Sequence, residues 1–112
     1  MSLKPTKKTD KELFALIEDN IYQKKYVFLV HSRLRLKERH ISELDVLSIL
    51  LGKKGYGRKR NKKKDSFENP SIIDLAQDWK YCIEGYDIDG SGIRIILTFT
   101  EDLMPIITVI SI

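Results

Sequence analysis

Hydrophobic positions near the start of the chain repeat with the period of a helix. They follow an i, i+3, i+4, i+8 pattern at Leu13, Phe14, Leu16, Ile17 and Ile21. This spacing puts them on one side of a helix, which can be buried in a core. Thr9 and Glu12 fit a capping box, in which each side chain accepts a hydrogen bond from the backbone N–H of the other residue. The pattern predicts a helix over residues 10–22.

An uninterrupted apolar run follows at residues 26–30, and it predicts a buried strand. In residues 31–40, leucines alternate with basic residues, as they would on a half-buried strand. A helix is favoured here because the stretch consists of good helix formers and has no β-branched residue between Ser32 and His40. His31 and Ser32 are also suited to cap the start of such a helix.

A second capping box, from Ser42 to Asp45, predicts another helix that begins at Glu43 and turns away from the preceding one. Gly52 is suited to the left-handed conformation that commonly follows a helix, so we expect the helix to end there. Its buried side would consist of Leu44, Leu47, Leu50 and Leu51.

From residue 71 onward the pattern changes to that of strands. Apolar and polar residues alternate at 79–84, and an Asp-Gly turn within residues 87–92 connects them to a β-rich run at 93–100. The chain reverses again before the apolar run at 106–112, which gives an antiparallel meander of three strands. Two isoleucines at 72 and 73 could begin a further short strand.

Helices first and strands last indicate an α+β fold, with an N-terminal helix, a short helix pair and an antiparallel sheet that carries the helices on one face. The length of 112 residues and the hydrophobic content of 42% fit a single domain with a modest core. Within residues 1–112 we expect residues 1–8 to be disordered and residues 53–70 to form a mobile basic loop.

The composition narrows the class of protein further. No apolar run approaches the roughly 18 residues of a membrane helix, and the Lys-rich start is not followed by the apolar core of a signal peptide. We therefore expect a soluble, cytoplasmic protein. The single cysteine, Cys82, cannot form an internal disulfide, and no Cys/His cluster has the spacing of a zinc site. We interpret Cys82 as a small half-buried hydrophobe and expect no metal or cofactor.

Positive charge is concentrated in one segment. Residues 52–64 contain eight basic residues and no acidic one, so the rest of the chain, with 12 basic and 16 acidic residues, has a net charge of −4. Such a concentration is typical of surfaces that bind nucleic-acid phosphates, although a solvated loop without a partner has the same composition. The candidate nucleic-acid-binding residues are Lys53, Lys54, Tyr56, Arg58, Lys59, Arg60, Lys62, Lys63 and Lys64. Tyr56 could stack on an unpaired base.

A second group of candidate residues lies on the helix predicted in residues 31–40. His31, Arg35 and Arg39 are spaced at i, i+4 and i+8, so they would share one face of that helix. With the Ile-Ser pair at 41–42 and the Asp-Val pair at 45–46, they resemble a bacterial domain-of-unknown-function family whose motif reads H-x-x-x-R-x-x-x-R-G-I-S-x-x-D-V. This chain has His40 where the family has glycine, and its basic loop is unusually long.

That family is similar in layout to the BrnT and RelE-like ribonucleases, the small toxins of type II toxin–antitoxin systems. The resemblance implies metal-independent cleavage of RNA, either mRNA or ribosome-associated RNA, and an antitoxin protein as partner. It also implies that His31 acts as base or acid, because a histidine changes charge near neutral pH. Arg35 and Arg39 would bind the phosphate through their paired N–H donors.

Other interpretations of these residues stay open. His31 could be a capping or buried structural histidine, and the two arginines could lie on a solvated face or pair with nearby acids. At the level of function, the alternatives are a nucleic-acid-binding module without catalysis and a protein-interaction module that uses the Lys/Arg-rich loop.

Overall fold

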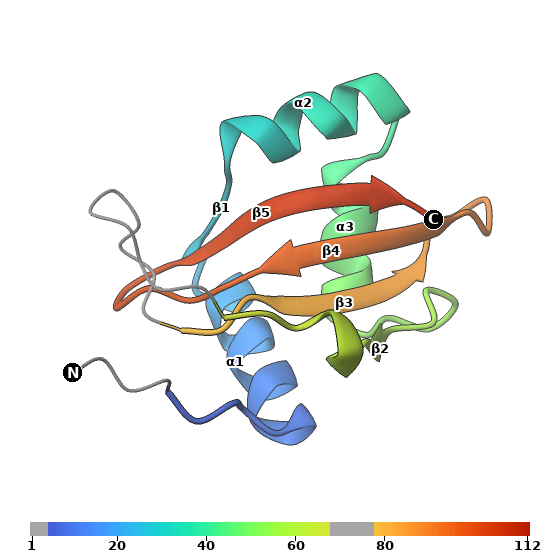
Figure 1. Ribbon diagram of the computed structural model, residues 1–112. Helices are drawn as coiled ribbons and strands as arrows, with labels where there is room; N and C mark the ends of the chain where they lie inside the picture. The colour runs from blue at the N-terminus through green and yellow to red at the C-terminus, as the bar shows by residue number, and fades with distance from the viewer. Residues whose placement is uncertain (1–4, 68–77) are drawn as a thin grey trace.

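The computed structural model describes residues 5–67 and 78–112, and it has the predicted α+β fold (Figure 1). The helices are α1 (Asp10–Tyr22), α2 (Val30–Arg39), α3 (Glu43–Leu50) and the 3₁₀ helix η1 (Lys62–Lys64). The strands are β1 (Tyr26–Phe28), β2 (Lys59–Arg60), β3 (Tyr81–Tyr86), β4 (Gly92–Leu97) and β5 (Met104–Ser111). No helix in the described part of the chain is long and apolar enough to cross a membrane.

The five strands form one sheet in the order β1-β5-β4-β3-β2. The predicted meander is confirmed, because β3, β4 and β5 pair antiparallel in sequence order. The predicted strand at 26–30 is shorter than expected and lies at an edge, where β1 pairs parallel with β5. Leu29 and Val30 are exposed, and Val30 already belongs to α2. The strand expected at residues 72 and 73 lies outside the described residues.

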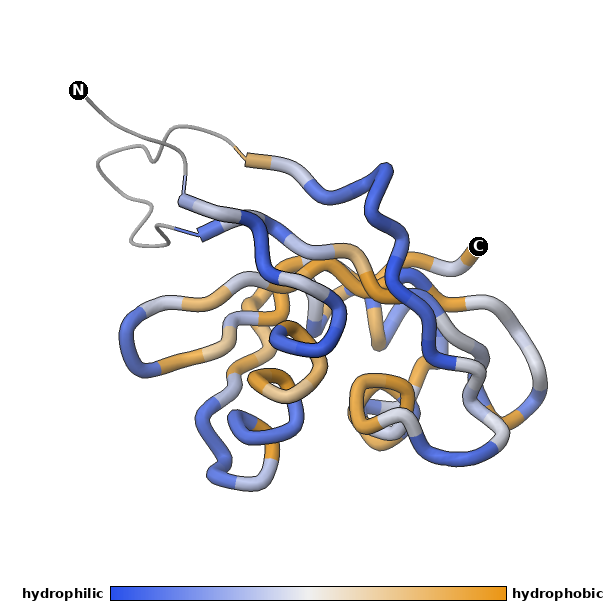
Figure 2. The backbone as a smooth tube through the Cα atoms, turned by 90° about the horizontal axis from the view of Figure 1, so that it is seen from below, coloured by the Kyte–Doolittle hydropathy of each residue, from blue (hydrophilic) through white to orange (hydrophobic). Residues whose placement is uncertain are grey.

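The two faces of the sheet differ in what covers them. Helices α1 and α3 lie on the same face, as Figures 1 and 2 both show, and α2 packs against β5. The core between helices and sheet includes a cross-strand row of Ile83, Ile95 and Val109 together with Leu13 and Ile17 of α1, and all five side chains are fully buried. The opposite face of the sheet carries no helix among the described residues except η1 at its edge.

Local sequence signals set the ends of α1 and α3. The capping box of α1 is present, with Thr9 and Glu12 each accepting from the other's backbone N–H. In α3, the Ser42 side chain accepts from the N–H of Leu44, and the helix is followed by Gly52 at a φ of +67°. Each such cap contributes about 1 kcal/mol to stability. Both helix starts and the glycine stop were therefore correctly predicted. The capping box expected from Ser42 to Asp45 is not formed, because Ser42 accepts from Leu44 instead, and Leu44, which was expected to be buried, is exposed.

The predicted turn between β3 and β4 is also confirmed. The Asp87 carboxylate accepts hydrogen bonds from the N–H groups of Asp89 and Ser91 at 2.9 and 2.8 Å, and Gly90 has a φ of +81°. An aspartate that bonds to the backbone ahead of it, followed by glycine, is typical of a tight turn. The turn therefore explains the Asp87 carboxylate, and Asp89 takes part in the turn through its backbone N–H.

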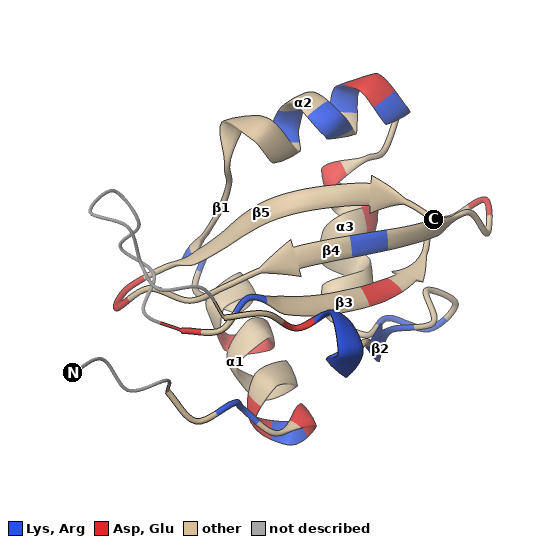
Figure 3. Cartoon of the chain, viewed as in Figure 1, with Lys and Arg blue, Asp and Glu red and all other residues tan. Residues whose placement is uncertain are grey.

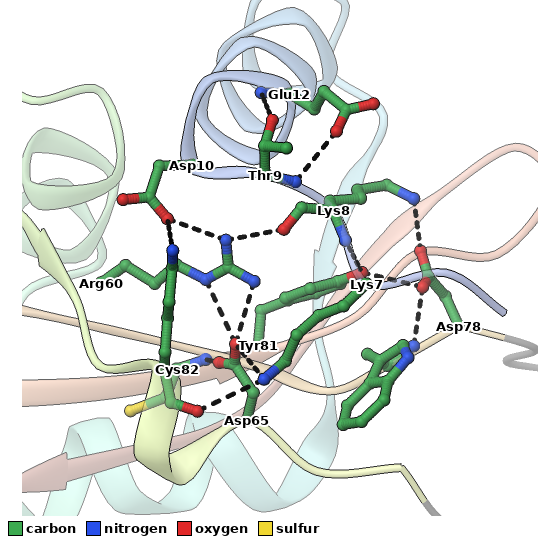
Figure 4. Close-up of polar contacts among 12 residues, drawn as sticks. Lys7, Lys8, Thr9, Asp10, Glu12, Arg60, Asp65, Asp78, Tyr81 and Cys82 are labelled. Carbon is green, nitrogen blue, oxygen red and sulfur yellow. Dashed lines mark hydrogen bonds and ion pairs between the residues drawn. The ribbon is translucent and has the colours of Figure 1, made fainter. Parts of the chain in front are cut away.

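The expectation of disorder in residues 1–8 is wrong for residues 5–8, while residues 1–4 lie outside the description. The indole N–H of Trp79 donates to the carbonyl of Pro5 at 2.8 Å. The ammonium of Lys8 bonds to Asp78 at 2.7 Å (Figure 4). The backbone N–H of Lys8 also donates to the Tyr81 hydroxyl at 3.2 Å. The segment before α1 is thus tied to the start of β3.

The mobile loop expected at 53–70 is likewise corrected for residues 53–67. Part of it forms β2 and η1, and the N–H of Asn61 donates to the carbonyl of Cys82 at 2.9 Å. Ser66 and Lys80 then form an isolated antiparallel bridge. The segment is held along β3 by these backbone contacts, and only residues 68–70 of the expected loop are outside the description.

Candidate nucleic-acid interface

Helix α2 begins without a side-chain cap. Its N-cap residue is Leu29, and no side chain accepts a hydrogen bond there. The prediction that His31 and Ser32 cap the helix is therefore wrong. Ser32 is buried and its hydroxyl donates to the carbonyl of Leu29 at 2.8 Å. His31 lies in the first turn and is exposed, which also excludes a buried structural role for it.

The C-terminal end of α2 is formed by His40 in a left-handed conformation, with a φ of +54°. This is the position at which the resembled motif has glycine, and glycine adopts such a φ without steric strain. The histidine keeps the conformation because its N–H still donates to the carbonyls of Leu36 and Lys37. His40 therefore occupies, in this chain, the left-handed position for which glycine is the usual residue.

His31, Arg35 and Arg39 occupy successive turns of α2, as predicted. In the described part of the chain, neither His31 nor Arg39 makes a side-chain hydrogen bond or ion pair, and both are exposed. Arg35 approaches the carboxylate of Glu38 to 3.9 Å, with 42% of the arginine side chain exposed. A surface pair of this length contributes little to stability and leaves the guanidinium accessible to a ligand.

The rest of α2 explains why its basic residues remain outside. Ser32 and Leu36 are the buried residues of this helix, which packs against β5. The helix contains four basic residues and one acid, so it has a net charge of +3. Arg33 and Lys37 are exposed and have no side-chain partner among the described residues. Figure 3 shows these cations along the helix.

The nine candidates of the basic segment divide into two groups, and Arg60 shows the difference most clearly. Its side chain is 1% exposed and bonds to the Asp65 carboxylate through Nε and Nη2 at 3.1 and 2.9 Å. Its Nη1 donates to the carbonyl of Lys8 and to Asp10 at 2.7 and 2.9 Å (Figure 4). The expectation that Arg60 binds nucleic acid is therefore wrong, because its donors are used inside the protein.

Arg58 is also a structural residue. Its guanidinium lies over the ring of Phe14, 4.0 Å from the centroid, and donates to the carbonyl of Leu50 at 3.1 Å. The Glu18 carboxylate lies 3.6 Å away. These contacts join β2 to α1 and to the end of α3, so Arg58 is not a free cation on the surface.

The structure does not support Tyr56 as a stacking residue. It packs against the core, its hydroxyl donates to Asp45 at 3.4 Å, and its carbonyl accepts from the N–H of Tyr86 at 2.8 Å. Because its ring packs against the core and is only partly exposed, Tyr56 offers a base less of its surface than a tyrosine in an open loop would. The glycines around it had suggested an open loop, whereas the segment turns back onto β3.

Six lysines form the accessible part of the basic segment. They are Lys53, Lys54, Lys59, Lys62, Lys63 and Lys64. Lys62 is paired with Asp10 at 3.3 Å, although 60% of the lysine side chain is exposed. Those of β2 and η1 lie beside β3, at the edge of the sheet opposite to α2 (Figure 3). The two predicted groups of residues therefore form two separate basic surfaces.

A polar group that the sequence did not indicate lies on the sheet face opposite α1 and α3. Arg94 Nε donates to Glu84 Oε2 at 2.8 Å, and Asn61 donates to the same oxygen at 3.1 Å. Arg94, first of all, and Asn61 hold the pKa of Glu84 below its ordinary value. Strand alternation in the sequence can indicate which face of its strand each of Glu84 and Arg94 occupies. That they lie opposite each other follows only from the register of β3 with β4.

Cys82 and Tyr81 are fully buried, so Cys82 is a small apolar residue as expected but is more deeply buried than the predicted half-buried position. Burial raises the pKa of the Cys82 thiol to about 11, and burial also raises the pKa of Tyr81. At neutral pH the cysteine is therefore a thiol and not a nucleophilic thiolate. Among the described residues, no three His, Cys, Asp or Glu side chains are arranged to hold a metal ion.

No family model, curated protein or solved structure matches this chain. The resemblance to the domain-of-unknown-function family therefore rests on the motif that begins at His31.

Proposed function

We propose that this chain is an RNA-binding protein of the toxin-like endoribonuclease kind, and that α2 is the element that contacts RNA. One observation carries the proposal. The basic side chains of α2 are exposed and almost free of intramolecular partners within the described chain, whereas Arg58 and Arg60 are used inside the protein. Concentrated, unneutralised positive charge favours binding to phosphates because it releases condensed counterions.

The spacing of the three motif residues suits a phosphodiester backbone. Residues four apart on a helix lie about one turn, or roughly 5–6 Å, from each other. Arg35 and Arg39 can therefore approach one phosphate or two adjacent ones, each with paired N–H donors. His31 lies one turn before Arg35 on the same side of the helix.

Cleavage would require the following proton transfers. His31 removes the proton from a ribose 2′-hydroxyl, the 2′-oxygen attacks the neighbouring phosphorus, and the bond from phosphorus to the 5′-oxygen breaks. The leaving 5′-oxygen takes a proton from water, and a 2′,3′-cyclic phosphate remains on the other fragment. Arg35 and Arg39 stabilise the additional negative charge that develops on the phosphate in the transition state.

The experiment uses the purified chain and a 5′-labelled single-stranded RNA. We expect His31→Ala to abolish cleavage and retain binding, because it removes the base but leaves the cations. Arg35→Ala and Arg39→Ala should each weaken binding roughly tenfold and reduce the slope of log K against log salt by about 0.7. Lys11→Ala is the matched control, since it removes one exposed charge from α1. Cleavage by His31→Ala at the wild-type rate would exclude the catalytic role.

Binding without cleavage is the second candidate function. It is favoured by the fact that no described residue forms a hydrogen bond with the imidazole of His31 and so orients it. The same assay separates the two, because a wild-type chain that shifts the RNA without cutting it is a binding module. An acidic partner protein, such as an antitoxin, would compete for the α2 surface. An mRNA or ribosome-associated substrate implies a cytoplasmic location.

A further inference from the structure

We infer that Arg94 forms a second phosphate-binding site, on the sheet face opposite α1 and α3, for the single-stranded RNA that α2 binds. The inference rests on the proposed function and adds a residue outside the helix motif. Arg94 lies on β4, and on this face its cross-strand neighbours are Glu84 on β3 and Ile110 on β5. Because β5 packs against α2, one strand lies between the helix and the column of residues that contains Arg94.

The arginine is held in place and remains available to a ligand. Its bond with Glu84 uses only Nε, and the Glu84 side chain is 8% exposed, so the carboxylate cannot easily move away. Asn61 fixes the same carboxylate oxygen from the other side. The Arg94 side chain is 25% exposed. Among the described residues no oxygen accepts from its two Nη groups, and the nearby Cys82 sulfur is only a weak acceptor.

The charge around Arg94 favours an anionic ligand. Lys59 lies opposite Glu84 in the register of β2 with β3, so one row across the sheet runs Lys59, Glu84, Arg94. The single carboxylate is neutralised by Arg94, and the exposed ammonium of Lys59 leaves the row with a net positive charge. The lysines of η1 extend this positive charge along the same edge.

An exposed aromatic ring favours a nucleic acid over free phosphate. Tyr86 is 48% exposed and lies two residues from Glu84, on the same face of β3. Its ring rests against Gly57, where an added Cβ would be 2.9 Å from Cδ2, so one side is supported by the protein. The diagonal from Tyr86 to Arg94 is a cross-strand distance of roughly 7–8 Å between Cα atoms. A base stacked on Tyr86 could therefore have its phosphate at Arg94.

The test measures binding of fluorescein-labelled octauridylate RNA by fluorescence anisotropy, with inorganic phosphate as a parallel ligand. Arg94→Lys keeps the charge and loses the forked donors, and we expect it to weaken RNA binding about tenfold. Tyr86→Ala should weaken binding by a similar factor, while Tyr86→Phe keeps the ring and should bind as the wild type does. Millimolar phosphate should not displace the RNA from the wild type.

If Arg94→Lys does not fold, the double variant Glu84→Gln/Arg94→Gln removes both charges together and should show the same loss of binding. Equal affinities of the wild type and Arg94→Lys, or of the two Tyr86 variants, would overturn the inference. It would leave the proposed function standing if Arg35→Ala still weakens binding. A wild-type chain that does not bind the RNA would overturn both.

Discussion

At the scale of single residues, Arg60 shows how one side chain can organise distant parts of the chain. Its guanidinium joins Asp65, the carbonyl of Lys8 and Asp10, and it lies over the Tyr81 ring at 5.2 Å. Asp65, whose side chain is fully buried, also accepts from the N–H of Cys82 at 2.9 Å. The buried ion pair of Arg60 and Asp65 therefore holds three parts of the chain together: β2, β3 and the segment that precedes α1.

We expect Arg60→Ala to lower the free energy of unfolding by about 3–5 kcal/mol, because it leaves the Asp65 carboxylate buried without its strongest partner. Urea denaturation followed by circular dichroism measures the change. Lys63→Ala, on the exposed part of η1, is the control and should differ from the wild type by less than about 0.5 kcal/mol. Similar midpoints for the two variants would contradict a structural role for Arg60.

Sequence reasoning was weakest for single charged residues. Cys82 was predicted to be half-buried and is fully buried, because the segment that contains Asp65 covers its side of β3. Arg60 was assigned to the surface because its neighbours in sequence are lysines. Its partner Asp65 is close in sequence, but its other partners, Asp10 and the carbonyl of Lys8, lie about 50 residues away. Arg94 was not predicted to be a site residue at all, because its partner Glu84 can be identified only from the register of β3 with β4.

At the scale of elements, local signals predicted the helices better than the edges of the sheet. The start of α1 and the start of α3 follow from caps that involve residues two or three apart. The edge strands β1 and β2 depend on pairing with β5 and β3, which lie far along the chain. The sequence of the basic segment has no local pattern that predicts a strand as short as the two residues of β2. The part of the candidate site that lies on α2, with His31, Arg35 and Arg39, could be predicted because helical spacing alone places these residues on one side.

The end of α2 offers a test of element stability. We expect His40→Gly to raise the free energy of unfolding by about 0.5–1 kcal/mol, because glycine adopts the left-handed conformation at φ +54° without strain. Arg39→Gly, one position earlier and inside the helix, should instead lower it by about 1 kcal/mol. Thermal and urea denaturation of both variants would measure the difference. A lower stability of His40→Gly would show that the histidine side chain stabilises this turn.

At the scale of the whole molecule, many basic side chains lie toward two opposite edges of the sheet, on α2 and on the segment that contains β2 and η1, while acidic ones are distributed over the helices, β3 and the loops (Figure 3). Several of the acids are tied into the fold. The pKa of Asp10 is lowered chiefly by its hydrogen bond with Arg60, and that of Glu84 chiefly by Arg94. The pKa of Glu12 is lowered chiefly by the backbone N–H of Thr9 in the capping box.

These shifts predict how stability depends on pH. A carboxyl group whose pKa is lower in the folded state stabilises the fold above its unfolded-state value, about 4, and this contribution is lost as the pH falls toward the lowered value. We expect the free energy of unfolding to be insensitive to these groups between pH 7 and pH 5 and to decrease below that range. Urea denaturation at pH 7, 5, 4 and 3 would measure this.

Glu84→Gln separates one contribution from the others. The variant should be less stable than the wild type at pH 6, and the difference should shrink as the pH falls below the ordinary carboxyl range and the wild-type carboxylate becomes protonated. A difference that stays constant over the whole range would mean that Glu84 acts through its shape and hydrogen bonds rather than its charge.

The pairing of β1 with β5 affects the order in which the protein can be assembled during synthesis. Tyr26 lies opposite Met104, so β1 leaves the ribosome long before β5, the strand with which it pairs in the described part of the chain, is made. Until then α2 also lacks the strand against which it packs. A nascent chain that stops before β5 would expose both β4 and the inner side of α2, and such a chain would be a target for chaperones and proteases. The helix with the free cations would therefore be held in place only in chains that have been translated through β5.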